Sequence, residues 1–271
     1  MIQVGTLGYF WLRYDDSLIQ LTATQGKIIT ALYCARGTLH QDTLIDQIWE
    51  YPAQIAPGTF RTHISRLRAS IKNAGYDPDL LFTTTPLAGD RNAYRIRHEV
   101  QSDGDRATSL SNSGVEAFTR GDIDLAIPLL RQAASLWQPI TRQDQILAAV
   151  SGLAFAFPVI KELWDTRREA LTRLAAAEIL LGLSSKAAAS LERLSADWCE
   201  DREIARLLAF ALYDSGKPGE AADLCMRMSA LDHVTGVADQ LFRDLHRQVL
   251  NRTLDVRSLA GAPLSTHAVP G

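Results

Sequence analysis

Several common signatures of function are missing from this sequence of 271 residues. Its three cysteines, Cys34, Cys199 and Cys225, lie far apart, form no CxxC pair and have no histidine beside them at metal-ligand spacing. Neither a disulfide framework nor a zinc site is therefore indicated. We expect three reduced thiols and no bound metal.

Catalytic motifs are missing as well. The sequence contains no GxxxxGKS or GxxxxGKT loop, no GxSxG and no HExxH, and the GKP at 216–218 lacks both the preceding glycine and the hydroxyl. Asp244 and His246 are two residues apart, which on a helix points their side chains to different faces. The sequence therefore predicts a protein that is not an enzyme and that needs no cofactor.

No segment has the pattern of an export signal or a membrane anchor. The N-terminal MIQVGTLGYFWLRYDD lacks a cationic start followed by a sustained apolar run. No stretch approaches the roughly 20 apolar residues that a membrane-spanning helix needs. We expect a cytoplasmic protein with no membrane partner.

The length and the charge distribution indicate two domains with different properties. A chain of 271 residues is long enough for two separate cores. Its net charge is −3, but residues 1–97 hold 10 Lys/Arg against 8 Asp/Glu, which leaves 18 against 23 for the remainder. A nearly neutral domain can still bind a polyanion if one face is basic, because binding depends on the charges that reach the phosphates.

The segment from Gly58 to Gly75, GTFRTHISRLRASIKNAG, predicts a helix with one apolar and one basic side. Its apolar residues follow the i, i+4, i+7, i+11 spacing of a stripe that packs on a core; they are Phe60, Ile64, Leu67 and Ile71. The other side carries no acid and includes Arg61, Thr62, Ser65, Arg66, Arg68 and Lys72. Guanidinium groups interleaved with short hydroxyls suit base edges and phosphates. The alternative is an ordinary surface helix that happens to be basic.

The elements around this helix predict a winged helix-turn-helix domain over residues 1–97. Residues 2–21 alternate as short strands around a turn at 15–17, and helical periodicity follows at 26–37 and 42–50. After the basic helix, residues 80–97 have the pattern of a hairpin with a turn-rich tip at 87–92. In this layout the last helix enters the major groove of DNA.

The second half of the chain predicts an all-α domain. Residues 98–112 lose the apolar periodicity and gather Ser, Asp and Gly, which indicates a linker. Residues 113–254 are helical in pattern and rich in Ala and Leu, with weak self-similarity typical of tetratricopeptide-like helical hairpins. Residues 255–271, rich in Ala, Pro and Ser, are expected to form a disordered tail. The predicted fold is mainly α with a small β component.

Several segments together resemble the Streptomyces antibiotic regulatory protein family, in which an OmpR-type winged helix precedes a bacterial transcriptional activation domain of tetratricopeptide-like helices. The segments in the first half are VGTLGYF, TLIDQIW, THISRLRASI and AYRIR. Those in the second half are IKELWDTRREALTRLAAAEILLG and AFALYDSGKPGEAADLC. The resemblance covers nearly the whole chain.

The resemblance implies that the helix matching Thr59 to Arg68 contacts DNA. Thr62 and Arg66 would face the major groove, where the Arg66 guanidinium can bond bidentately to O6 and N7 of a guanine. The other implied or candidate contacts to phosphates or outer base edges are Thr59, Arg61, Ser65, Arg68 and Lys72. His63 lies beside the apolar stripe, so a packing role and a phosphate contact both remain open. Arg91, at the hairpin tip, is placed to reach a minor groove, with a solvated turn residue as the alternative.

Taken together, the sequence predicts a DNA-binding transcriptional activator. By resemblance it would bind direct repeats in double-stranded DNA upstream of antibiotic biosynthetic genes, associate as a homodimer on DNA and recruit RNA polymerase holoenzyme. Two alternatives remain: a helical-repeat scaffold whose winged helix binds protein, and a ligand-sensing repressor. Salt dependence separates the first alternative from DNA binding, because phosphate contacts release counterions.

Overall fold

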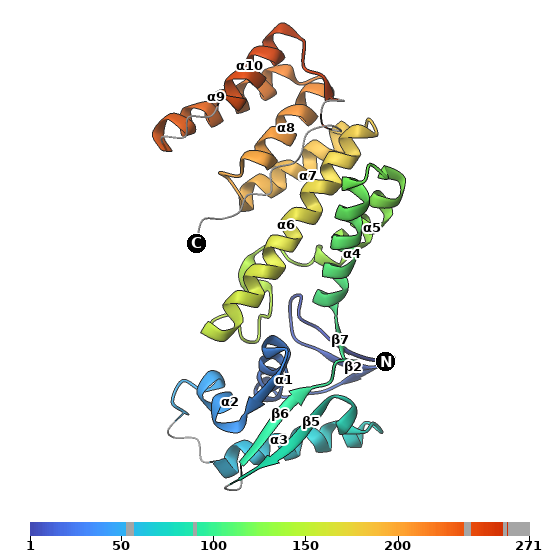
Figure 1. The fold of residues 1–271 in the computed structure, drawn as a ribbon, viewed down its shortest axis with the longest axis vertical. Coiled ribbons are helices and arrows are strands. Elements are labelled where there is room, and N and C mark those ends of the chain that lie inside the picture. Colours follow the sequence, from blue (N-terminus) through green and yellow to red (C-terminus); the bar gives the residue numbers. More distant parts are fainter. Residues whose placement is uncertain (53–56, 89–90, 236–239, 257–258, 260–271) are drawn as a thin grey trace. The chain divides into compact units, whose positions relative to one another are not determined.

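The computed structural model describes residues 1–52, 57–88, 91–235, 240–256 and 259 (Figure 1). Helices dominate this described part, and its strands all lie within the first 102 residues. The mainly α fold with a small β component that the sequence predicted is confirmed. The chain divides into two compact units: Met1–Ser109 with Ala133–Arg167, and Leu110–Gln132 with the described residues from Arg168 onward.

A four-stranded sheet in the order β3-β2-β1-β7 opens the first unit. β1 (Ile2–Val4) pairs antiparallel with β2 (Leu12–Tyr14), which pairs antiparallel with β3 (Ser17–Ile19) across the predicted turn. β7 (Gln101–Ser102) adds a short parallel edge to β1. The alternating N-terminal residues therefore form the predicted sheet, which gains one strand from a segment far along the chain.

Three helices follow this sheet. α1 (Ala23–Ala35) begins with a capping box, in which the Thr22 hydroxyl accepts from the Gln25 backbone and the Gln25 side chain accepts from the Thr22 backbone. α2 (Gln41–Ile48) and α3 (Pro57–Asn73) come next, and α3 is the predicted basic helix. These are the three helices of the predicted winged helix-turn-helix.

A second, three-stranded sheet supplies the wing of this domain. β5 (Phe82–Leu87) and β6 (Arg91–Ile96) form the expected antiparallel hairpin, and β4 (Thr38–His40), a strand that the sequence did not indicate, pairs with β6. A short 3-10 helix, η2 (Pro78–Leu80), connects α3 to β5. The register pairs Thr84 with Tyr94, so both residues lie at the middle of the hairpin.

The apolar stripe of α3 is buried, as its spacing predicted. Phe60, Leu67 and Ile71 have no exposed surface, and Ile64 is 6% exposed. The Phe60 ring meets the edge of the Tyr94 ring, with the centroids 5.6 Å apart, and thereby packs α3 on the hairpin. This contact fixes which side of α3 remains on the surface.

Gly75 terminates α3 just beyond its last helical residue, Asn73. Gly75 has a φ of 88°, a left-handed conformation that glycine adopts without strain. Its N–H donates to the Lys72 carbonyl at 2.9 Å, and the Tyr76 N–H donates to the Ile71 carbonyl at 3.2 Å. This pair of bonds is a Schellman motif, which satisfies the last carbonyls of the helix.

The linker expected over residues 98–112 is replaced in the structure by β7 and by the start of α4 (Asp103–Thr119). The Ser102 hydroxyl accepts from the Asp105 N–H at 2.7 Å, while the Asp105 carboxylate accepts from the Ser102 N–H at 3.3 Å. The polar residues that suggested a loop are thus helix-capping residues. Asp103 also binds the N-terminal segment, since one of its carboxylate oxygens accepts from the Thr6 N–H at 2.6 Å and from the Thr6 hydroxyl at 2.7 Å.

Residues 133–167 complete the first unit, although the sequence assigned them to the second domain. They include the end of α5 (Ile123–Trp137), the short helices η3 (Gln143–Gln145) and η4 (Ala154–Ala156), and the start of α6 (Phe157–Leu180). The Leu147 N–H donates to the Thr6 carbonyl at 2.8 Å, and Leu7 forms a bridge with Ile146. The first unit is therefore larger than the predicted winged helix domain.

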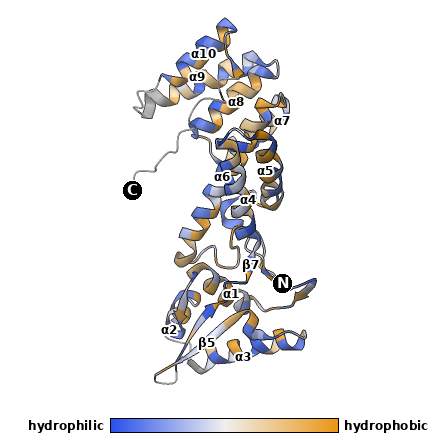
Figure 2. Ribbon diagram, turned by 45° about the vertical axis from the view of Figure 1, so that its right-hand side comes forward, coloured by the Kyte–Doolittle hydropathy of each residue, from blue (hydrophilic) through white to orange (hydrophobic). Residues whose placement is uncertain are grey.

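The second unit is helical throughout its described part. Successive helices pack on one another: α7 (Ser184–Asp197), α8 (Arg202–Asp214), α9 (Pro218–Thr235) and α10 (Leu241–Asn251). Each of these helices contains both apolar and polar residues (Figure 2). Their apolar residues pack together in a common core, as expected for amphipathic helices. No helix in the described ranges is long and apolar enough to cross a membrane.

The apolar core of the second unit includes residues beyond 254, the expected end of the domain. Of the predicted tail 255–271, the described residues are Asp255, Val256 and Leu259. Leu259 is 2% exposed within the apolar cluster, and Val256 packs against it. The remaining residues of the predicted tail lie outside the described part.

Candidate nucleic-acid interface

One side of α3 faces away from the core, and we call it the outward face. It consists of Thr59, Thr62 and Arg66, spaced i, i+3, i+7 and all exposed. The Thr62 hydroxyl donates to the Gly58 carbonyl at 2.9 Å, so its oxygen can still accept a hydrogen bond from a ligand. Among the residues that the structure describes, none forms a hydrogen bond or an ion pair with the Arg66 guanidinium. The outward face therefore presents a cation with unused donors.

A second row of α3, the wing-side face, looks toward the hairpin. It consists of Arg61, Ser65 and Arg68, spaced i, i+4, i+7. Together with residues of β5 and β6 it lines a hollow of about 330 Å³, whose members are Arg61, Ile64, Ser65, Arg68, Thr84, Asn92 and Tyr94. The two faces are adjacent, so a ligand lying across the outward face would also meet the rim of this hollow.

The guanidinium of Arg68 is engaged on two sides, whereas that of Arg66 has no partner among the described residues. One nitrogen donates to the Asp79 carboxylate at 2.6 Å and the other to the Thr84 hydroxyl at 3.0 Å. The guanidinium carbon lies 4.9 Å from the centroid of the buried Phe82 ring. The side chain is 31% exposed, so it still reaches the surface beside the hollow.

His63 and Lys72 occupy two further positions on α3. The His63 ring lies 5.8 Å from the Trp49 ring, with the planes 46° apart, and His63 is half-buried. This contact packs α3 against the residue that ends α2, consistent with the packing alternative for His63. Lys72 is exposed in the last turn, where a cation also interacts favourably with the helix dipole.

Arg91, the candidate wing contact, lies at the start of β6. Its side chain and the preceding residues 89–90 fall outside the described part of the chain. The backbone of Arg91 pairs with Leu87 of β5. Arg91 therefore stays a prediction for the hairpin tip.

The structure adds residues to the site that the sequence did not indicate. Thr84, Asn92 and Tyr94 line the hollow between helix and hairpin, and Asp79 pairs with Arg68 beside it. Burial raises the pKa of the Tyr94 hydroxyl, against the opposing effects of the Asn92 hydrogen bond and the nearby guanidinium groups. The alternation of residues 82–96 gave a signal that one face of the hairpin is buried. It could not show which residues meet α3.

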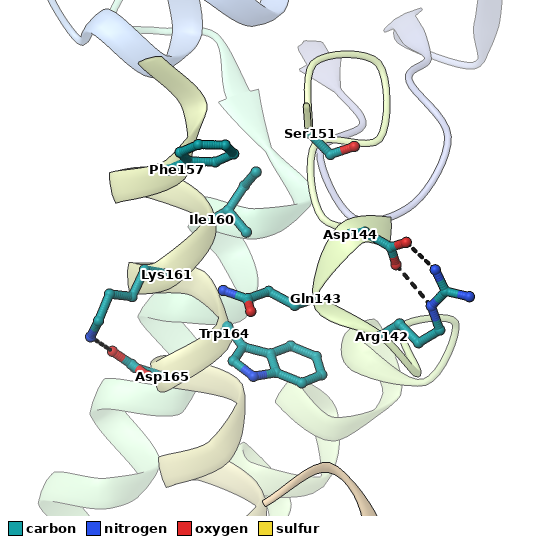
Figure 3. A pocket seen from close by; sticks show the side chains of 9 residues that line it. All are labelled: Arg142, Gln143, Asp144, Ser151, Phe157, Ile160, Lys161, Trp164 and Asp165. Carbon is teal, nitrogen blue, oxygen red and sulfur yellow. Dashed lines mark hydrogen bonds and ion pairs between the residues drawn. The ribbon is translucent and has the colours of Figure 1, made fainter. Parts of the chain in front are cut away.

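A second hollow in the first unit, of about 740 Å³, contains none of the candidate DNA contacts (Figure 3). One wall is α6, with the apolar side chains of Phe157, Ile160 and Trp164; the other includes Gln143 and Ser151. Its charged residues pair with one another, as Arg142 with Asp144 and Lys161 with Asp165. Cations that are already neutralised make this hollow a poor site for a polyanion. No group of three His, Cys, Asp or Glu residues in the described ranges could hold a metal ion.

Two family descriptions match the chain. Residues 16–87 match the family described as transcriptional regulatory protein, C terminal, and residues 102–250 match the bacterial transcriptional activator domain. The first match contains α3, and the second begins at the residue that caps α4.

Individual proteins match over much of the same length. The chain is 29% identical over 226 residues to the regulatory protein AfsR of Streptomyces coelicolor. This alignment covers 81% of the chain but only 21% of AfsR. The chain is 27% identical to the transcriptional regulatory protein MoaR1 of Mycobacterium tuberculosis, over 96% of the chain and 82% of the relative. A solved structure of Mycobacterium tuberculosis EmbR, in complex with a low affinity phosphopeptide, superposes with a TM-score of 0.78 at 24% identity. It covers 96% of the chain and 68% of that structure, and supports the fold.

Proposed function

Because the chain belongs to the family of antibiotic regulatory protein type transcriptional regulators, with an OmpR-type winged helix and a bacterial transcriptional activator domain, we propose that α3 reads a specific DNA sequence. As the sequence predicted, this DNA-binding regulator is not an enzyme. We propose further that it binds direct repeats and activates a biosynthetic gene cluster by recruiting RNA polymerase. The chain spans about a fifth of the length of AfsR. Binding of direct repeats, activation of a gene cluster and recruitment of RNA polymerase are therefore proposals for this chain.

The outward face of α3 carries the proposal. The apolar side of α3 is buried against α1, α2 and Tyr94 of the hairpin, so Thr59, Thr62 and Arg66 are the side chains that a docking duplex would meet first. α3 contains no acid, and Arg66 has unused donors in the described structure. A buried acid or a partner for Arg66 would have given the helix an ordinary structural role instead.

Each side chain has a proposed role that follows from its position. Arg66 donates to O6 and N7 of a guanine in the major groove, with Thr62 contacting the neighbouring base edge. Arg61 and Ser65, on the wing-side face, bind the phosphates that flank the groove. The remaining residues proposed to contact the DNA backbone are Thr59, Lys72 and Arg91. His63 is proposed to contact a phosphate in addition to its packing on Trp49.

The mode of assembly on DNA follows from the direct repeats. Two copies that bind repeats one helical turn apart lie on the same side of the duplex in the same orientation. This geometry favours a head-to-tail homodimer over a two-fold symmetric one. The helical repeats of the second unit then offer the surface for RNA polymerase.

Genomic footprinting tests the proposal. The protein is crosslinked in its host, the bound DNA is sequenced, and the experiment is repeated with Arg66→Ala. We expect a few sites that share a direct-repeat motif, all lost in the variant. Diffuse binding, or none, in the parent protein would contradict sequence-specific regulation and favour the protein-scaffold alternative.

A further inference from the structure

The contacts of Arg68 join three consecutive parts of the winged helix. Its guanidinium starts on α3, pairs with Asp79 in η2 at 2.6 Å and reaches Thr84 in β5 at 3.0 Å. It also lies over the ring of Phe82, the first residue of β5. One planar, multidentate side chain thus spans the distance between the helix and the wing.

Asp79 is a shared anchor for this connection. Its carboxylate binds Arg68, while its carbonyl accepts from the Arg97 Nε at 2.7 Å. The Arg97 backbone N–H donates to the Leu81 carbonyl at 2.9 Å, so the end of β6 is attached to the same segment. η2 is therefore held both to α3 and to the far strand of the hairpin.

We propose that Arg68 is a positioning residue that sets the wing against α3, rather than a phosphate contact. This rests on the proposed function of α3 and deepens it, because the wing and the outward face must meet the duplex together. A phosphate would have to compete with a carboxylate and a hydroxyl that each already accept from one of the two terminal nitrogens of the guanidinium. By fixing the hairpin, Arg68 determines how β5 and β6 meet the DNA beside the outward face.

The two roles of Arg68 predict opposite effects of Asp79→Asn. If Arg68 were a phosphate contact, removal of the competing carboxylate would release it and strengthen DNA binding. If Arg68 positions the wing, loss of the ion pair loosens the hairpin and weakens specific binding. The substitution keeps the size of the side chain and the backbone carbonyl that binds Arg97, so the rest of the anchor remains.

The experiment measures specific DNA affinity of the full chain for Asp79→Asn, Arg68→Lys and a matched control. Asp46→Asn is that control, because Asp46 is an exposed acid of α2 and its substitution changes the net charge equally. We expect Asp79→Asn to bind about 5-fold more weakly than Asp46→Asn. We expect Arg68→Lys to lose a similar factor, since a lysine keeps the charge but cannot span Asp79 and Thr84.

Hydrogen exchange of the backbone amides in β5 and β6, measured without DNA, gives an independent result. Faster exchange in both variants than in Asp46→Asn is expected. The positioning role is overturned if Asp79→Asn binds as tightly as Asp46→Asn or more tightly, if Arg68→Lys binds like the parent, or if exchange is unchanged. If the parent binds no specific DNA, the proposed function of α3 fails, and the exchange rates alone decide the role of Arg68.

Discussion

Truncation of Leu67 to alanine should destabilise the first unit strongly while leaving the DNA-facing residues of α3 unaltered. Leu67 has no exposed surface and lies on the apolar stripe, one position after the exposed Arg66. Removal of three carbon atoms costs about 2.4 kcal/mol at roughly 0.8 kcal/mol for each buried carbon. The unfilled cavity adds to this loss, which gives about 2–5 kcal/mol in the free energy of unfolding.

Urea denaturation of the full chain, followed by tryptophan fluorescence, measures this loss. With a slope of about 2 kcal/mol per molar urea, the midpoint of the first unit should fall by about 1–2.5 M in Leu67→Ala. Arg66→Ala on the same helix is the matched control, and as an exposed substitution it should change stability by less than about 0.5 kcal/mol. Equal midpoints for Leu67→Ala and the parent would show that the assignment of faces on α3 is wrong. So would an equal loss in both variants.

Two further predictions concern DNA binding and thiol chemistry. Arg61, Lys72 and Arg91 are each proposed to neutralise one phosphate per protomer. A plot of log Kobs against log salt concentration, measured by fluorescence anisotropy over about 50–300 mM salt, should then have a slope of about −3, since each phosphate contributes roughly −0.9. A slope near zero would favour a protein-binding winged helix. Burial raises the pKa of Cys34 to about 12 and that of Cys225 to about 11, whereas Cys199 is exposed. Iodoacetamide at pH 8 should therefore modify one thiol rapidly, and Cys199→Ser should remove this phase. At that pH about 0.1% or less of Cys34 and Cys225 is in the reactive thiolate form. A second rapidly modified thiol would contradict the raised pKa values.

The helices of the first unit could be predicted because local patterns determine them. The spacing of Phe60, Leu67 and Ile71 identified the buried side of α3, and by exclusion the exposed position of Arg66. The segment 98–112 was harder, because serine and aspartate are common both in loops and at helix N-termini. Only the hydrogen bonds between Ser102 and Asp105 show that these residues begin a helix.

The candidate site could be predicted only where it depends on a single helix. The outward face of α3 follows from its periodicity, and the sequence therefore indicated Thr62 and Arg66 together. The engagement of Arg68 depends on η2 and on the hairpin, whose approach to α3 is determined by tertiary packing. A basic residue on a basic helix carries no local sign that a carboxylate 11 positions later will occupy it.

The boundary of the DNA-binding domain is a physical question that a truncation can answer. A fragment ending at residue 97 would lose the pairing of β7 with β1 and the hydrogen bonds from Thr6 to Asp103. At about 1 kcal/mol for each lost hydrogen bond, together with the newly exposed Leu7, it should be about 3–5 kcal/mol less stable than the first unit of the full chain. A fragment of residues 1–109 retains β7 and Asp103 but lacks residues 133–167, so its urea midpoint should lie between the two. Equal midpoints for all three would mean that the winged helix is independent of α4, and that the hydrogen bonds at Thr6 hold the start of α4 without stabilising the sheet.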